Sequence, residues 1–126
     1  MWIKYANNHK GFCVGFNFDV MFKFLGGGGP VIYHDELPLI YPEPKQSIDE
    51  QHVLQAYSKL RKWEFEKEYR TDRFSPIPLT LAQRRINLPA NAYKQLIIGK
   101  EMTESDKADL INSIPEDLKH ITIIQQ

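Results

Sequence analysis

Eight prolines divide this chain into short segments and limit how long any helix or strand can be. Proline has no backbone N–H to donate, and it disfavours helical geometry at the residue before it. Three of the eight lie in the segment Leu37 to Lys45, which we therefore expect to be an extended surface connection. Pro30 and Pro115 each follow a short helical pattern and should end it.

The composition is that of a folded protein with no strong net charge. The 126 residues include 42% hydrophobic and 12% aromatic side chains, too many for a disordered chain. This length suits one domain, so we expect residues 1–126 to form a single domain. Sixteen basic and sixteen acidic residues cancel, so no overall field attracts nucleic acid or anionic membranes. Binding of that kind would need a local patch.

Cys13 is the only cysteine, which excludes an intrachain disulfide. Its neighbours Phe12 and Val14 favour a buried apolar thiol over a nucleophile, because no basic residue within two positions would lower its pKa. The apolar runs are far shorter than the roughly 20 residues that span a bilayer. The N-terminus also lacks the pattern of a secretory signal. The default location is therefore the cytoplasm.

Helical spacing and capping residues predict several helices. Ser47 and Glu50 have the spacing of a capping box, and apolar residues then recur at helical intervals through Arg61. Thr103 should likewise begin a helix that reaches Ile114. Two shorter helical segments are expected, one of them capped by Asp19: Met1 to Asn8 and Val20 to Leu25.

Period-two alternation predicts strands between these helices. In Gly11 to Phe18, one face of the alternation, which we expect to be core, consists of Phe12, Val14, Phe16 and Phe18. Trp63 to Asp72 alternates in the same way. Shorter strands are expected at Val31 to Tyr33, Arg85 to Leu88, Leu96 to Gly99 and His120 to Gln126. The pattern indicates an α+β fold with a mixed, mainly antiparallel sheet and three or four helices.

The expected strand Trp63 to Asp72 carries the strongest candidate site. Side chains two residues apart on a strand share a face at roughly 6 to 7 Å, and the polar face here is Glu64, Glu66, Glu68 and Arg70. The opposite face, with Trp63, Phe65 and Tyr69, should be buried. The polar row is either a solvated edge or the lining of a cleft. In a cleft, repulsion would raise the pKa of one carboxyl while Arg70 keeps another ionised.

Three residues near this row complete the candidate site. His9 precedes a predicted strand and would act with Glu66, Glu68 and Arg70 as a catalytic group, or would be an ordinary surface histidine. Tyr5, about one helical turn earlier, and Trp63 are candidate substrate-binding residues. For Tyr5 the alternative is a packing role with an exposed hydroxyl.

No segment implies a cofactor or a metal. The run Gly26 to Gly29 is followed by Pro30 rather than by Gly-Lys-Ser/Thr, so a flexible turn is favoured over a phosphate loop. His34, His52 and nearby carboxylates lack the spacing of a strong metal site. Basic and aromatic residues interleave around Trp63, as in proteins that bind single-stranded nucleic acid, but the intervening glutamates would repel phosphate.

Three segments resemble a known bacterial family, domain of unknown function 2971. The resemblance covers essentially the whole chain. It rests on the following residues, which occur in the order of the family pattern: Met1, Trp2, Tyr5, Ala6, His9, Gly11, Phe12 and Phe16; Trp63, Glu66, Glu68 and Arg70; and Ile97, Ile98 and Gly99. The resemblance favours the cleft interpretation for Glu66, Glu68 and Arg70, but the family implies no particular reaction.

Family members normally have a sizeable region before the Met-Trp pair, so the chain resembles a C-terminal portion that is truncated at its N-terminus. Two functions follow. One is a non-catalytic interaction domain that self-associates through the exposed strand edges Phe12 to Phe18 and Ile121 to Ile124. The other is an enzyme-derived domain that acts on a nucleotide or nucleic acid and is loosely similar to ADP-ribosyltransferases.

Overall fold

The computed structural model describes all residues, 1–126, and the backbone forms two compact units. The first unit contains residues 1–21 and 87–126, and the second contains residues 22–86. Helices and mixed strand pairings occur in the chain, which confirms the α+β class. No helix is both long and apolar enough to cross a bilayer. That residues 1–126 are a single domain stays a prediction.

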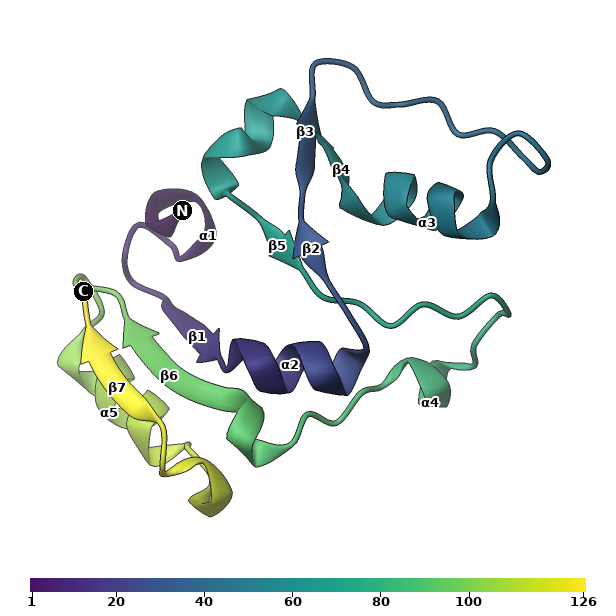
Figure 1. Ribbon diagram of the computed structural model, residues 1–126. Helices are drawn as coiled ribbons and strands as arrows, with labels where there is room; N and C mark the ends of the chain where they lie inside the picture. The colour runs from purple at the N-terminus through teal and green to yellow at the C-terminus, as the bar shows by residue number, and fades with distance from the viewer. The chain divides into compact units, whose positions relative to one another are not determined.

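The first unit is built on a three-stranded sheet with the order β1-β6-β7 (Figure 1). Strand β1 (Phe12–Phe16) is antiparallel to β6 (Tyr93–Ile98), and β7 (Thr122–Gln125) is parallel to β6. A short helix, α1 (Trp2–Tyr5), precedes β1. The connection from β6 to the parallel strand β7 contains a helix, as parallel strands require.

The core of the first unit lies between this sheet and helix α5 (Glu104–Asn112). Leu96, Ile98 and Met102 are buried, and Ile98 is fully buried. Partly buried aliphatic side chains from α5 and the following segment pack against them: Leu110, Ile111, Ile114 and Ile121. Thr103 Oγ1 accepts a hydrogen bond from Asp106 N at 3.1 Å and caps α5, as its position in the sequence predicts. Short 3-10 helices flank the core at η2 (Ala90–Ala92) and η3 (Glu116–Leu118).

A left-handed turn before β1 lies against the end of β6. Asn7, Asn8 and His9 all have positive φ, at 47°, 54° and 67°. The His9 carbonyl accepts a hydrogen bond from Glu101 N at 3.0 Å. A Cβ atom at Gly99 would lie only 2.1 Å from His9 O, so glycine is needed there for the two backbones to approach.

The second unit combines short strand pairs with one longer helix. Helix α3 (Ile48–Tyr57) leads directly into β4 (Ser58–Leu60), which pairs in parallel with β3 (Ile32–His34). The short strand β2 (Gly29–Pro30) pairs antiparallel with β5 (Tyr69–Arg70). Three helical segments complete the chain: α2 (Phe18–Leu25), which crosses from the first unit, η1 (Arg61–Glu66) and α4 (Leu81–Arg84).

In the second unit, the structure confirms the predictions that rest on residues close together in the sequence. Ser47 Oγ accepts a hydrogen bond from Glu50 N at 3.2 Å, and Glu50 Oε2 accepts one from Ser47 N at 2.7 Å. This capping box begins α3 where the sequence predicts. The segment Leu37 to Lys45 has no helix or strand, as its prolines predict. Helix α3 ends at Tyr57 rather than Arg61, because the next three residues pair with β3.

The predicted strand Trp63 to Asp72 is wrong over most of its length. Residues 61–66 form the 3-10 helix η1, Lys67 is left-handed with φ 45°, and only Tyr69–Arg70 is strand. Arg61 Nη1 lies 3.6 Å from Glu64 Oε2, one helical turn along η1. The left-handed turn at Lys67 ends this helix and breaks the period-two alternation, so that the chain enters β5 only at Tyr69.

Other expectations also need correction. Residues 85–88 form no strand, and α2 is capped by Asn17 Oδ1, which accepts from Val20 N at 3.2 Å, rather than by Asp19. The expected core face of β1 is 49%, 41% and 43% exposed at Phe12, Val14 and Phe16. Cys13 is exposed rather than buried, and so are Phe65 and Tyr69. The side chains of β1 are exposed because the core of the first unit forms around β6 and α5 instead.

We expect Ile98→Ala to lower the free energy of unfolding by about 2–5 kcal/mol, because Ile98 is fully buried and its loss leaves a cavity. Urea unfolding followed by circular dichroism measures the change. Ile3→Ala is the matched control, since Ile3 is 70% exposed, and it should change stability by less than about 0.5 kcal/mol. Equal effects of the two substitutions would contradict this description of the core.

Candidate functional site

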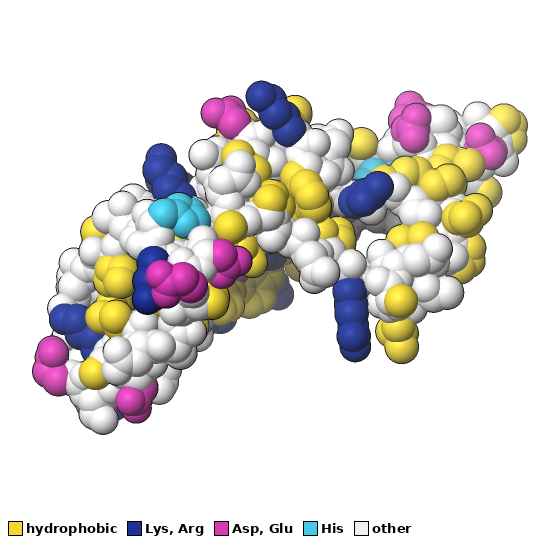
Figure 2. Space-filling model, turned by 90° about the horizontal axis from the view of Figure 1, so that it is seen from below, with side chains coloured by type: hydrophobic (Ala, Val, Ile, Leu, Met, Phe, Trp, Pro, Cys, Tyr) yellow, Lys and Arg dark blue, Asp and Glu magenta, His cyan; other side chains and the backbone are white.

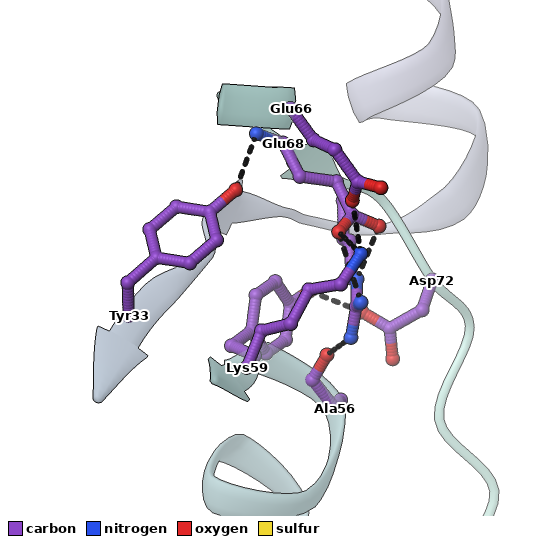
Figure 3. Close-up of polar contacts among 8 residues, drawn as sticks. Tyr33, Ala56, Lys59, Glu66, Glu68 and Asp72 are labelled. Carbon is purple, nitrogen blue, oxygen red and sulfur yellow. Dashed lines mark hydrogen bonds and ion pairs between the residues drawn. The ribbon is translucent and has the colours of Figure 1, made fainter. Parts of the chain in front are cut away.

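The candidate site is a cluster of four charged side chains in the second unit (Figure 3). Lys59 comes from β4, Glu66 from the end of η1, and Glu68 and Arg70 from the segment that forms β5. Lys59 Nζ donates to Glu68 Oε2 at 2.8 Å and also to Glu66 Oε2. The left-handed residue Lys67 lies between the two glutamates, and both carboxylates contact the same ammonium group.

Arg70 holds the Glu68 carboxylate from the other side. Its Nε donates to Glu68 Oε1 at 2.9 Å and its Nη2 donates to Glu68 Oε2 at 3.1 Å, a bidentate pair. Arg70 Nη1 donates to the carbonyl of Ala56, near the end of α3. Glu68 N donates to the Tyr33 hydroxyl at 2.9 Å. The cluster therefore joins β3, α3, β4 and β5 (Figure 3).

The electrostatics keep this cluster charged at neutral pH. Hydrogen bonds from Arg70 and then from Lys59 lower the pKa of Glu68 to about 2, and they outweigh the opposing effect of burial. The hydrogen bonds to Glu66 and Glu68 raise the pKa of Lys59, and the bond to Glu68 raises the pKa of Arg70. Glu66 has the least exposed side chain of the four, at 8%. Glu68 is thus an anion with two cationic partners, unsuited to donate a proton as a general acid.

The structure brings together three of the six site residues predicted from the sequence: Glu66, Glu68 and Arg70. Glu64, the fourth member of the predicted row, lies apart on η1 beside Arg61. The predicted polar row is therefore wrong, although three of its members meet. The indole of Trp63 is near the cluster, with Lys59 Nζ 5.6 Å from its ring centroid.

The other two predicted residues, His9 and Tyr5, belong to the first unit. The His9 ring stacks on Trp2 with centroids 5.9 Å apart and an interplanar angle of 7°. Its Nδ1 is buried and has no hydrogen-bond partner. Tyr5 is 55% exposed, with Lys4 Nζ 5.5 Å from its ring centroid. Catalytic or substrate-binding roles for His9, Tyr5 and the cluster residues stay predictions.

Sequence reasoning missed the cation that organises the cluster. Lys59 falls inside the segment predicted as helix, so nothing in the spacing indicated that it would face Glu66 and Glu68. The contacts of Asp72 were not predicted from the sequence either. Its carboxylate accepts hydrogen bonds from His52 Nε2 at 2.8 Å and from the Tyr57 hydroxyl. That hydrogen bond raises the pKa of Tyr57 to about 12, so Tyr57 keeps its proton.

No group of three or more His, Cys, Asp or Glu side chains is placed to hold a metal ion. In the charged cluster, Lys59 and Arg70 already contact the carboxylate oxygens of Glu66 and Glu68. The cations of the protein therefore stand where a metal would have to bind.

Fold and site together define an α+β protein in which an ion-pair cluster joins short strands. The family described as Protein of unknown function (DUF2971) matches residues 1–71, more than half of the chain, and the chain belongs to this family. The match includes all six site residues predicted from the sequence. It does not extend to Ile97, Ile98 and Gly99, so the family match is shorter than the resemblance implied. Searches of curated proteins and of solved structures find no match.

We expect the contribution of Glu68 to stability to depend on pH. Its pKa is depressed in the folded protein, so the contribution is fully present above the ordinary value of 4.5 and is lost as pH falls toward about 2. The free energy of unfolding of the native chain minus that of Glu68→Gln should be constant above about pH 5.5 and shrink as pH falls from 4.5 toward 2. Urea titrations at several pH values measure it. A difference that grows on acidification would contradict the ion pairing.

Proposed function

We propose that the chain is a non-catalytic interaction domain that self-associates through strand edges. The observation that carries this proposal is β1, which lies at an edge of the three-stranded sheet. Its side chains Phe12, Val14 and Phe16 are each more than 40% exposed. An edge strand with unpaired backbone groups and apolar side chains is a template for pairing with another chain.

The opposite edge of the same sheet has a similar surface. In β7, Ile123 and Ile124 are 40% and 41% exposed. Large hydrophobic side chains are exposed elsewhere as well, and Figure 2 shows hydrophobic side chains at several places on the surface that it draws. Burial of such apolar surface favours association. A two-fold contact of more than roughly 1,000 Å² would be a specific interface.

The charged cluster supports a non-catalytic role. Lys59 and Arg70 together balance Glu66 and Glu68, and each carboxylate contacts at least one cation. A reacting group would have to leave these partners before it could act on a substrate. A closed set of charges that joins four elements suits a structural role.

The proposal predicts a dimer in solution that a charge on β1 disrupts. Val14→Lys places an ammonium group on the exposed edge strand, where it opposes pairing with a second copy. Sedimentation velocity at micromolar concentrations should show the native chain as a dimer and Val14→Lys as a monomer.

Leu81→Lys is the control, because Leu81 is 79% exposed and lies on α4 rather than on a strand edge. It should leave the dimer intact. A native chain that stays monomeric, or a Leu81→Lys variant that dissociates as fully as Val14→Lys, would contradict the proposal.

A second candidate function is that of an enzyme-derived domain that acts on a nucleotide or nucleic acid. The observation that favours it is the meeting of Glu66, Glu68 and Arg70, which the sequence singled out. By analogy with ADP-ribosyltransferases, ionised Glu68 would stabilise the positive charge that develops on a ribose as nicotinamide leaves NAD⁺ and water attacks. The sequence also predicted His9 as a catalytic residue, and His9 belongs to the first unit.

This second candidate predicts that the chain releases nicotinamide from NAD⁺. Chromatography of the reaction mixture measures the release. Glu68→Gln should abolish the release under conditions in which urea unfolding shows that the variant is still folded, so that a lost catalytic group is distinguished from a lost ion pair. His9→Ala should reduce it as well. Glu64→Gln is the control, because Glu64 lies apart from the cluster on η1. Absence of nicotinamide release from the native chain would reject the assignment for this substrate.

A further inference from the structure

A cavity in the second unit has a lining that includes none of the four residues of the charged cluster. It has a volume of about 570 Å³, within the range of roughly 300–1,000 Å³ typical of small-molecule sites. Its apolar lining comes from five side chains: Leu25, Pro30, Ile32, Val53 and Phe74. The backbone of Gly26 to Gly29 forms another part of the lining, and no side chain occupies that part. The cavity therefore offers apolar walls of a size that suits a small organic molecule.

The polar part of the cavity is organised around Asp72. Its Oδ2 accepts from His52 Nε2 at 2.8 Å, and its Oδ1 accepts from the Tyr57 hydroxyl. The His52 ring also packs on Phe74, with centroids 4.3 Å apart. His52 is thus fixed by a carboxylate and by an aromatic ring, while its Nδ1 has no partner in the protein.

The lining contains one guanidinium group that can bind an anion. Asp72 already accepts from two donors, so both of its oxygens have partners within the protein. Arg73 lines the same cavity, is exposed, and has no ion-pair partner. The lining therefore contains one satisfied carboxylate and one unpaired guanidinium, which is the group that binds carboxylates and phosphates most effectively.

We propose that this cavity binds a small organic anion, with its apolar body between Val53 and Phe74 and its anionic group on Arg73. His52, which Asp72 and Phe74 hold in place, forms part of the wall beside the ligand. This site is independent of the self-association proposed above, because its lining residues all lie within residues 25–74 and β1 is not among them.

Binding is tested by NMR titration of the ¹⁵N-labelled chain with three probes of similar shape: benzoate, benzamide and benzylammonium. Benzoate should give saturable shifts of the amide signals of Gly26 to Gly29, and benzamide should bind more weakly. Benzylammonium should bind most weakly of the three, because Arg73 repels it. Inorganic phosphate alone should give no saturable shifts in these glycines, because it has no apolar body.

Two substitutions separate the two parts of the site. Arg73→Gln should weaken benzoate binding by about tenfold and leave benzamide binding nearly unchanged, because only the charged contact is lost. Phe74→Ala should weaken both probes. Arg85→Gln is the matched control, since Arg85 is exposed and lines no part of this cavity, and it should bind all probes like the native chain. Spectra without probe establish that each variant is folded.

The proposal is overturned if none of the probes shifts the Gly26 to Gly29 signals. It is also overturned if benzoate and benzamide bind equally, or if Arg73→Gln and Arg85→Gln have the same effect on benzoate. The first result would mean that the cavity is not a binding site for such molecules. The others would mean that the anionic group is not recognised by Arg73.

Discussion

The contact of one ammonium group with two carboxylates determines how the second unit is held together. Lys59 lies between Glu66 and Glu68, and Arg70 completes the set. Two glutamates this close would repel each other without these cations. Because the strands of this unit are only two or three residues long, their backbone ladders alone contribute few hydrogen bonds. The side-chain cluster is therefore a main connection between the two strand pairs.

The first unit depends instead on apolar packing and on a close backbone approach. Ile98 is fully buried under α5, and the next residue, Gly99, lies against the carbonyl of His9. A side chain at position 99 would separate the left-handed turn from the end of β6. This arrangement gives His9 a backbone role in the fold, whether or not its imidazole has a function of its own.

Sequence alone predicted the features that neighbouring residues determine. The capping residues Ser47 and Thr103 each bond to a backbone N–H three residues away, so their helices could be located from local spacing. The structure of Trp63 to Glu66 could not be predicted in this way. The alternation of its side chains is compatible with a strand, and the 3-10 helix η1 depends on the turn at Lys67. Likewise, Lys59 reaches Glu66 only because β4 ends α3 early, a consequence of pairing with a distant strand.

The charged cluster and the cavity of the second unit share the same two backbone segments. Arg70 Nη1 donates to the carbonyl of Ala56, and the residue after Ala56 is Tyr57, whose hydroxyl donates to Asp72. Asp72 is itself two residues after Arg70. The two bonds thus join the end of α3 to the segment that follows β5 at adjacent positions. The ion pairs that fix Arg70 therefore also fix Asp72 and, through Asp72, the orientation of His52 in the cavity.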